Sequence, residues 1–149
     1  MTSAPEVSRP QSASRPSRVS TTAVRWFKIV MWLGIAANIV CAVISIGWTD
    51  TVLNFLHLEP ARPLVWPRFA AFLLILLSIF YIPSAIDPLR HRYSAIVAML
   101  CRFAGVAFFL IVGGRYLVFG LFDFTFGLPQ AILWLIASRS AQRNFEGRS

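Results

Sequence analysis

Apolar residues in this chain gather into runs that are long enough to cross a membrane. The first run, residues 29–48, has twenty residues and no charged side chain. At a helical rise of 1.5 Å per residue it would span about 30 Å, the thickness of a hydrocarbon core. A signal peptide has a shorter apolar region followed by a small-residue cleavage site, whereas Thr49 and Asp50 follow here. The pattern therefore predicts an uncleaved transmembrane helix.

A second span is predicted at about residues 66–86, where positions 69–86 carry no charge. Pro83 and Pro88 disfavour a regular continuation, because proline lacks an amide hydrogen and biases the preceding residue away from helical geometry. The chain is therefore expected to turn at this point.

The remaining apolar stretch, residues 93–138, is too long for one span and fits two helices with a short turn. Gly113 and Gly114 lie near its midpoint, which places the helices at about 94–113 and 121–137. The sequence thus predicts an all-α integral membrane protein, a four-helix bundle occupying residues 23–139.

Both ends of the chain differ from this apolar region. Residues 1–22 contain nine Ser or Thr, three Pro and three Arg, and we expect a disordered basic tail there. Its two Ser-Arg-Pro repeats leave a recognition or phosphorylation site open, and its arginines suit anionic lipid headgroups. Residues 140–149 are expected to form a short cytoplasmic tail.

Positive charge is distributed unevenly between the two faces of this topology. Eleven Lys or Arg fall on the side of the amino terminus and three on the other side, which predicts that both termini are cytoplasmic. The three residues on the outer side are Arg62, Arg68 and Arg115.

The amino-acid composition also indicates a chain that is embedded in a lipid bilayer. Hydrophobic residues make up 57% of the chain, the mean hydropathy is +0.67, and the net charge of +8 follows from topology rather than from nucleic-acid binding. Cys41 and Cys101 both lie inside apolar runs, where a free thiol behaves as a small hydrophobic group, so no disulfide framework is expected.

Small residues recur at helical spacing in two of the spans and predict faces that pack against other helices. In the first span these are Gly34, Asn38, Cys41 and Ser45, and in the third they are Ser94, Ala98, Cys101 and Gly105.

The sequence offers no recognisable cofactor site. His57 and His91 are the only histidines and fall on opposite membrane faces, so they cannot jointly hold a haem, and no metal site is predicted. Phosphate-loop and nucleophile-elbow motifs are also lacking, which disfavours an enzyme. The sequence leaves open whether the protein binds a quinone or a lipid.

Four ionisable residues are candidates for buried ion pairs or ligand contacts: Arg102, Asp87, Asp123 and Arg115. Charges at bilayer depth are costly and usually face protein, water or a ligand. Asp87 is the nearest acid to Arg102 on the cytoplasmic side and is expected to be its partner. Asp123 is expected near the outer interface, where it could cap a helix. The sequence leaves open whether these residues form structural ion pairs or contact a ligand or a transferred proton.

The string from Tyr81 to Tyr93 is the most distinctive in the chain. Its two prolines predict a rigid cytoplasmic turn, in which Asp87, Arg90 and Arg92 could form a local ion-pair cluster. In architecture, residues 25–139 resemble small four-helix membrane proteins of the DoxX-like kind, and this resemblance implies a link to redox or quinone systems. Small multidrug transporters carry an acid in their first helix, which residues 29–48 lack. We expect a non-catalytic inner-membrane subunit of a larger, energy-converting bacterial complex that contacts other membrane subunits; a redox or quinone-interacting protein is the alternative.

Overall fold

A computed structural model of the protein describes residues 18–146, with side chains for residues 22–139. Most of the predicted disordered tail, residues 1–17, lies outside this range. The described chain has no strand and consists of α1 Arg18–Gly47, α2 Thr49–Phe55, α3 Val65–Ile86, α4 Arg92–Val112, the 3₁₀ helix η1 Gly114–Tyr116 and α5 Leu117–Glu146.

Four of these segments are long and apolar enough to cross a membrane: α1, α3, α4, and η1 together with α5. The predicted all-α bundle of four membrane-spanning helices is therefore confirmed. The described part of the chain is that of a multi-pass integral membrane protein.

Several element boundaries differ from those expected. The helix α1 begins at Arg18, so residues 18–22, assigned to the disordered tail, are helical. Likewise α5 continues to Glu146 through part of the segment expected as a tail at 140–149. Both helices extend beyond their apolar windows, because a helix satisfies its own backbone hydrogen bonds in water as well as in lipid.

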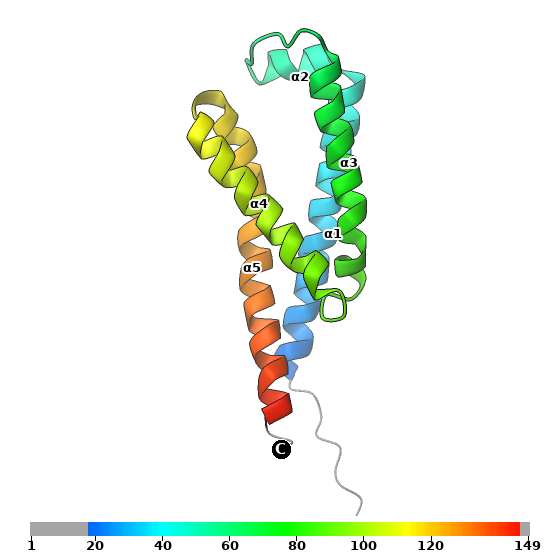
Figure 1. Ribbon diagram of the computed structural model, residues 1–149, viewed down its shortest axis with the longest axis vertical. Helices are drawn as coiled ribbons and strands as arrows, with labels where there is room; N and C mark the ends of the chain where they lie inside the picture. The colour runs from blue at the N-terminus through cyan, green and yellow to red at the C-terminus, as the bar shows by residue number, and fades with distance from the viewer. Residues whose placement is uncertain (1–17, 147–149) are drawn as a thin grey trace, which may run out of the picture.

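The short helix α2 lies between the first two spans, in a segment for which no helix was predicted. It follows directly after α1, and the Thr49 hydroxyl donates to the carbonyl of Ser45 at 2.6 Å. Asp50 lies in its first turn, where a negative charge favours the amino end of a helix. The helix α2 lies across the end of the bundle away from the described chain ends (Figure 1).

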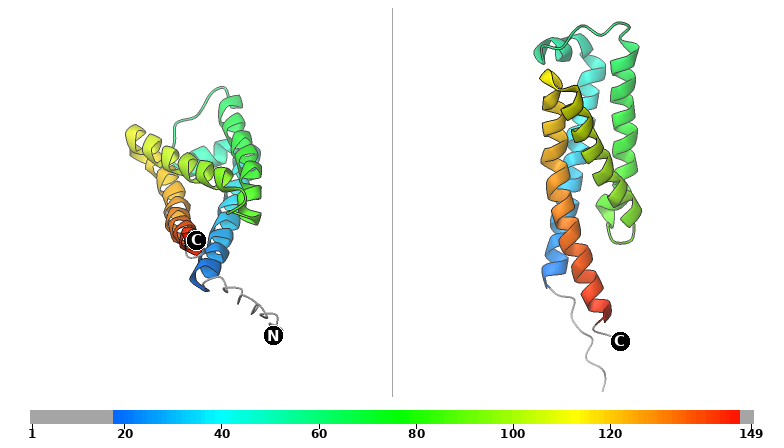
Figure 2. Two further views of the ribbon diagram at one scale, coloured as in Figure 1. Left: turned by 60° about the horizontal axis from the view of Figure 1, so that its bottom comes forward. Right: turned by 60° about the vertical axis from the view of Figure 1, so that its left-hand side comes forward.

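The spans alternate in direction, so the starts of α1 and α3 lie at opposite ends of the bundle (Figure 1). Both described chain ends lie at the same end, as the predicted topology requires; which side of the membrane this is remains a prediction. The helix α3 packs mainly against α1, and α5 packs against both α1 and α4. The views in Figure 2 show α3 and α4 close together at the turn that joins them and apart at their other ends.

The apolar core lies in the half of the bundle that holds the α3–α4 turn and the described chain ends. Its members come from the first part of α1, the last part of α3 and the first part of α4: Phe27, Met31, Ile35, Tyr81, Ala85, Ala95 and Ala98. Trp134 of α5 packs against this cluster, with its ring 5.9 Å from that of Phe27. One half of the bundle is therefore closed by a core.

The turn between α3 and α4 lies where the two prolines predict it. The helix continues through Pro83 and ends at Ile86, and Asp87 takes an extended conformation with φ −142° before Pro88. This is the geometry that a following proline favours, because its ring clashes with a helical predecessor.

Candidate functional site

Arg102 and Asp123 form an ion pair inside the α4–α5 hairpin. The Nη1 group of Arg102 donates to Oδ1 of Asp123 at 3.2 Å. The side chain of Arg102 is 2% exposed and that of Asp123 is 25% exposed. Arg102 lies midway along α4, Arg92–Val112, so the pair belongs to the middle of the span and not to a membrane surface.

The antiparallel hairpin brings these two residues together. Arg102 precedes Gly113 by eleven residues and Asp123 follows it by ten. Gly113 ends α4 with φ +70° and Gly114 has φ +60°, a backbone region that glycine adopts without strain. Two helices that reverse direction there place residues at equal distances from the turn side by side. The near-equal spacing about the glycine pair was the signal that could have predicted the partner.

The ion pair occupies space that is free because three neighbouring residues are glycines and have no side chain. A Cβ atom added to Gly34 of α1 would lie 2.6 Å from Nη2 of Arg102, and one added to Gly105 of α4 would collide with Oδ2 of Asp123. A Cβ atom on Gly127 of α5 would lie 3.3 Å from the Cβ of Arg102. Arg102 therefore extends from α4 across to α1, in a slot bounded by glycine backbone.

The prediction that Asp87 is the partner of Arg102 is wrong. Asp87 lies in the α3–α4 turn and accepts a hydrogen bond from the backbone amide of Arg90 at 3.2 Å. Arg102 is ten residues beyond the start of α4, which is about 15 Å of helix, and its side chain points to Asp123 instead. The expected ion pairs of Asp87 with Arg90 and Arg92 are likewise not seen within the described residues.

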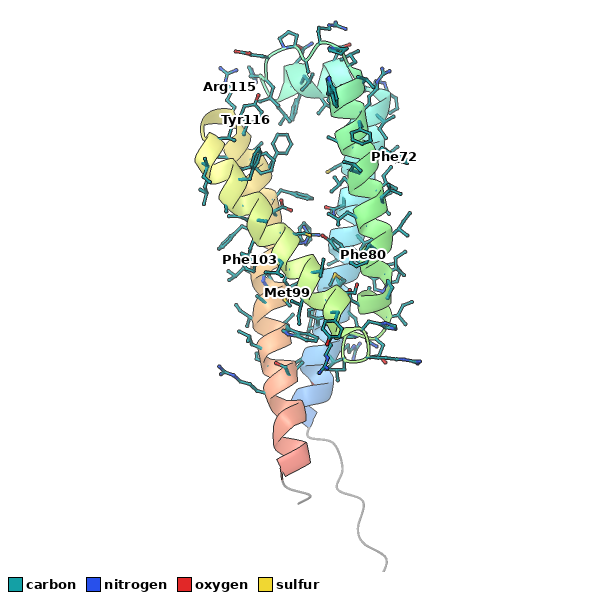
Figure 3. All side chains as sticks on the ribbon, viewed as in Figure 1. Phe72, Phe80, Met99, Phe103, Arg115 and Tyr116 are labelled. Atoms are coloured by element: carbon teal, nitrogen blue, oxygen red, sulfur yellow. The ribbon has the colours of Figure 1, made fainter. Side chains whose placement is uncertain are left out.

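Asp123 and Arg115 also differ from their expected roles. Asp123 lies six residues inside α5, so it does not cap the start of that helix. Arg115 lies at the tip of the α4–α5 hairpin (Figure 3) and donates to the backbone carbonyl of His57 in the α2–α3 loop. It therefore joins two outer loops and takes no part in the buried pair.

Two further arginines at this end of the bundle bind residues of α2. Arg68 donates through Nε to the Thr49 hydroxyl at 3.3 Å, and Arg62 lies 3.6 Å from Asp50 in a largely exposed pair. These contacts link the start of α3 to α2. They stabilise little individually, since exposed ion pairs contribute about 0 to 1 kcal/mol.

Further polar side chains lie around Arg102. Its guanidinium carbon is 5.2 Å from the ring centroid of Phe126, a cation–π distance. Tyr81 of α3 belongs to the buried cluster against which Cys101, the residue before Arg102, packs. Sequence reasoning missed Tyr81, because a tyrosine in an apolar run gives no signal of its neighbours.

Gln130 of α5 and Asn38 of α1 are the remaining buried polar side chains of this region. The amide nitrogen of Gln130 donates to the sulfur of Met31 at 3.6 Å. Met31 precedes Gly34 by three residues and Asn38 follows it by four, so the two amides lie about one turn on either side of the Arg102 slot. Gln130 was not among the predicted site residues.

The predicted small-residue faces are found in part. Gly34 and Asn38 are buried and Ser45 is half-buried, but Cys41 is exposed. Ala42 is buried in its place, because the face of α1 that meets α3 and α5 runs through Ile35, Asn38 and Ala42. In α4 the predicted residues all lie on the inner side: Ala98 is buried, and Ser94, Cys101 and Gly105 are half-buried.

The two histidines lie at opposite ends of the bundle. His57 follows α2, and His91 precedes α4 at the other end. Within the described residues, no group of three or more His, Cys, Asp or Glu side chains could hold a metal ion.

Comparisons with known proteins add no relative. No protein-family model matches the chain, and neither the search of curated proteins nor that of solved structures found a match.

Proposed function

We propose that the protein is a non-catalytic integral-membrane subunit or assembly partner of a larger complex, and that a transmembrane helix of another subunit packs against α3. One observation carries this proposal, an apolar groove of about 540 Å³ along α3. The groove is lined by Ala70, Leu73, Leu74, Leu76, Leu77 and Phe80.

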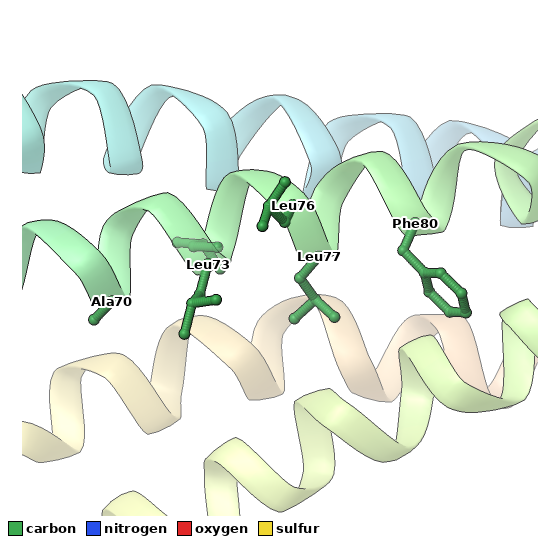
Figure 4. Close-up of a pocket in the computed structure, with 6 residues that line it drawn as sticks. Ala70, Leu73, Leu76, Leu77 and Phe80 are labelled. Atoms are coloured by element: carbon green, nitrogen blue, oxygen red, sulfur yellow. The ribbon is translucent and has the colours of Figure 1, made fainter.

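The groove lies where the bundle is open. Ala70, Leu73, Leu77 and Phe80 point from α3 towards α4 and α5 (Figure 4), yet α4 diverges from α3 beyond their joining turn. The core fills only the other half of the bundle. Another helix placed here would cover the part of α3 that α4 leaves free beyond their joining turn.

The dimensions of the groove suit one helix. Ala70 and Phe80 are ten residues apart, which is about 15 Å along α3 and nearly three helical turns. Interhelical contacts in membranes are held by packing, and packed helices lie about 8–10 Å apart. Each span also leaves most of its apolar window unburied, with 17–28% buried, so there is surface for further subunits.

The location and the host complex are part of the same proposal. The bias of Lys and Arg towards the side of the termini supports an orientation with both termini inside, and the membrane that we propose is a bacterial inner membrane. An energy-converting complex is our proposed host. Contacts of the basic amino-terminal segment with anionic lipids belong to this proposal too.

A membrane redox or quinone-interacting protein is the second candidate. The observation that favours it is the buried Arg102, which keeps N–H groups without a partner. Purification of a monomer with bound quinone would support this candidate over the first.

Site-specific photo-crosslinking tests the proposed docking. A photoreactive amino acid at Leu73 should give one adduct with a different integral membrane protein, identified by mass spectrometry. Ile44 is the matched control, because the Arg68–Thr49 hydrogen bond sets a register that places positions 44 and 73 at similar depth. Ile44 is exposed on α1, outside the groove, and should give lipid adducts only. Adducts at Leu73 with lipid alone, or with a second copy of this chain, would contradict the proposal.

A further inference from the structure

Five polar side-chain atoms in the bundle are buried and lack a hydrogen-bond partner within the described residues. They are Oδ1 of Asn38, the hydroxyl of Tyr81, Nε and Nη2 of Arg102, and Oε1 of Gln130. All four residues are at most 2% exposed. A buried donor or acceptor without a partner costs about 1–3 kcal/mol, so folded proteins leave few of them.

The residues that carry these atoms lie about the Arg102 slot, with the amides of Asn38 and Gln130 about one helical turn on either side of it. The guanidinium of Arg102 reaches α1 at Gly34, with Phe126 against it, and Tyr81 of α3 lies in the buried cluster against which the neighbouring Cys101 packs. Asn38 lies one turn further along α1. The four spans α1, α3, α4 and α5 therefore each supply a polar side chain to the middle of the bundle.

The unused hydrogen-bonding capacity restricts the chemistry of a ligand. Arg102 offers two donor nitrogens, which carry three N–H groups, Asn38 offers a carbonyl acceptor, and the Tyr81 hydroxyl can act as either. A molecule that bridges them must accept hydrogen bonds from the guanidinium and donate one to an amide oxygen. A hydroxylic oxygen does both, whereas a carbonyl oxygen can only accept.

The charges at the site restrict the chemistry of the ligand further. Asp123 already balances the charge of Arg102, so the site has no net charge to offer an ion. A neutral ligand avoids the cost of burying a further charge at this depth.

We propose that the centre of the bundle binds a neutral hydroxylic molecule, which bridges the guanidinium of Arg102 to Tyr81 and Asn38. Its source is either water or the hydroxyl group of a membrane-soluble molecule. Buried waters commonly make about three hydrogen bonds to groups that otherwise lack partners, which matches this set. The inference does not depend on the proposed subunit function.

Water-edited solid-state NMR on the full chain, with ¹⁵N-labelled arginine in deuterated lipid, tests the site. The Nε signal of Arg102 is identified by its loss in Arg102→Lys or by its proximity to the labelled carboxyl carbon of Asp123. We expect this signal to gain polarisation from water, or from the protons of a retained molecule. Extraction and mass spectrometry then separate the two sources, since only the second yields a hydroxylic compound.

Variants show which groups hold the ligand. Tyr81→Phe and Asn38→Leu should each reduce the transfer to Arg102 severalfold. Ser78→Ala is the matched control: Ser78 is fully buried on α3, but its hydroxyl already donates to the carbonyl of Leu74 at 2.8 Å. The transfer should be unchanged in this variant. If Arg102 in the wild-type protein receives polarisation from neither source while its contact with Asp123 is intact, the proposal is wrong.

Discussion

Removing either member of the Arg102–Asp123 pair is predicted to destabilise the protein by different amounts. Arginine does not lose its proton in proteins, whereas an aspartate left alone can take one up. Arg102 is 2% exposed, so Asp123→Leu leaves a buried charge whose Nη1 has lost its acceptor. This should cost about 3–5 kcal/mol. Asp123 is 25% exposed, so Arg102→Met should cost less, about 1–3 kcal/mol.

The double variant Arg102→Met/Asp123→Leu should cost about 2 kcal/mol less than the two single variants added together, because no uncompensated charge remains. We expect a coupling free energy of about 2 kcal/mol, roughly a 30-fold effect on the unfolding equilibrium. Polar pairs in membrane proteins average about 0.6 kcal/mol, so a buried ion pair should clearly exceed that value.

The assay is reversible unfolding in mixed micelles, followed by circular dichroism. Asp87→Asn is the control acid, because Asp87 contacts the amide of Arg90 and not Arg102. Its effect should simply add to that of Arg102→Met. Equal costs for the two single variants, together with additivity in the double variant, would refute the proposed energetic role of the pair.

Three further predictions concern packing, topology and the outer loops. Gly34→Ala should cost about 1–3 kcal/mol, because it displaces Nη2 of Arg102, whereas Gly47→Ala on the same helix has nothing within 4 Å and should be neutral in the same unfolding assay. A reporter enzyme active only outside the cytoplasm should be active when fused within residues 54–60 and inactive after Ser149; activity at Ser149 would rule out the four-span topology. Arg62→Gln should change the unfolding free energy by no more than about 0.5 kcal/mol, because its pair with Asp50 is exposed; a larger loss would show that the loop contact matters more than its geometry suggests.

The spans themselves could be predicted from sequence because membrane insertion depends on length and apolar composition. The turn at Pro83–Pro88 was predictable for a similar reason, since proline constrains the local backbone. The short helix α2 could not be predicted, because seven polar and apolar residues after a span carry no periodic signal.

Both members of the buried ion pair were among the predicted candidates, but their pairing, Tyr81 and Gln130 were not predicted. Depth alone singled out Arg102 and Asp123 as costly charges. Asp87 was chosen as the partner of Arg102 because both residues were assigned to the cytoplasmic side of the membrane. The register of the α4–α5 hairpin about Gly113 instead brings Asp123 next to Arg102. Cys41 was placed on the packing face by its size, but the rotation of α1 is set by its two neighbours, which bury Ala42 instead.

Purification in mild detergent from the native membrane tests the central claim most directly. The account predicts that the chain remains in a larger complex with other integral membrane proteins. It also predicts that Leu73→Arg in the α3 groove releases the chain as a folded monomer, whereas Ile44→Arg at similar depth on α1 leaves the complex intact. Recovery of the wild-type chain only as a monomer, under conditions that preserve other membrane complexes, would contradict the account.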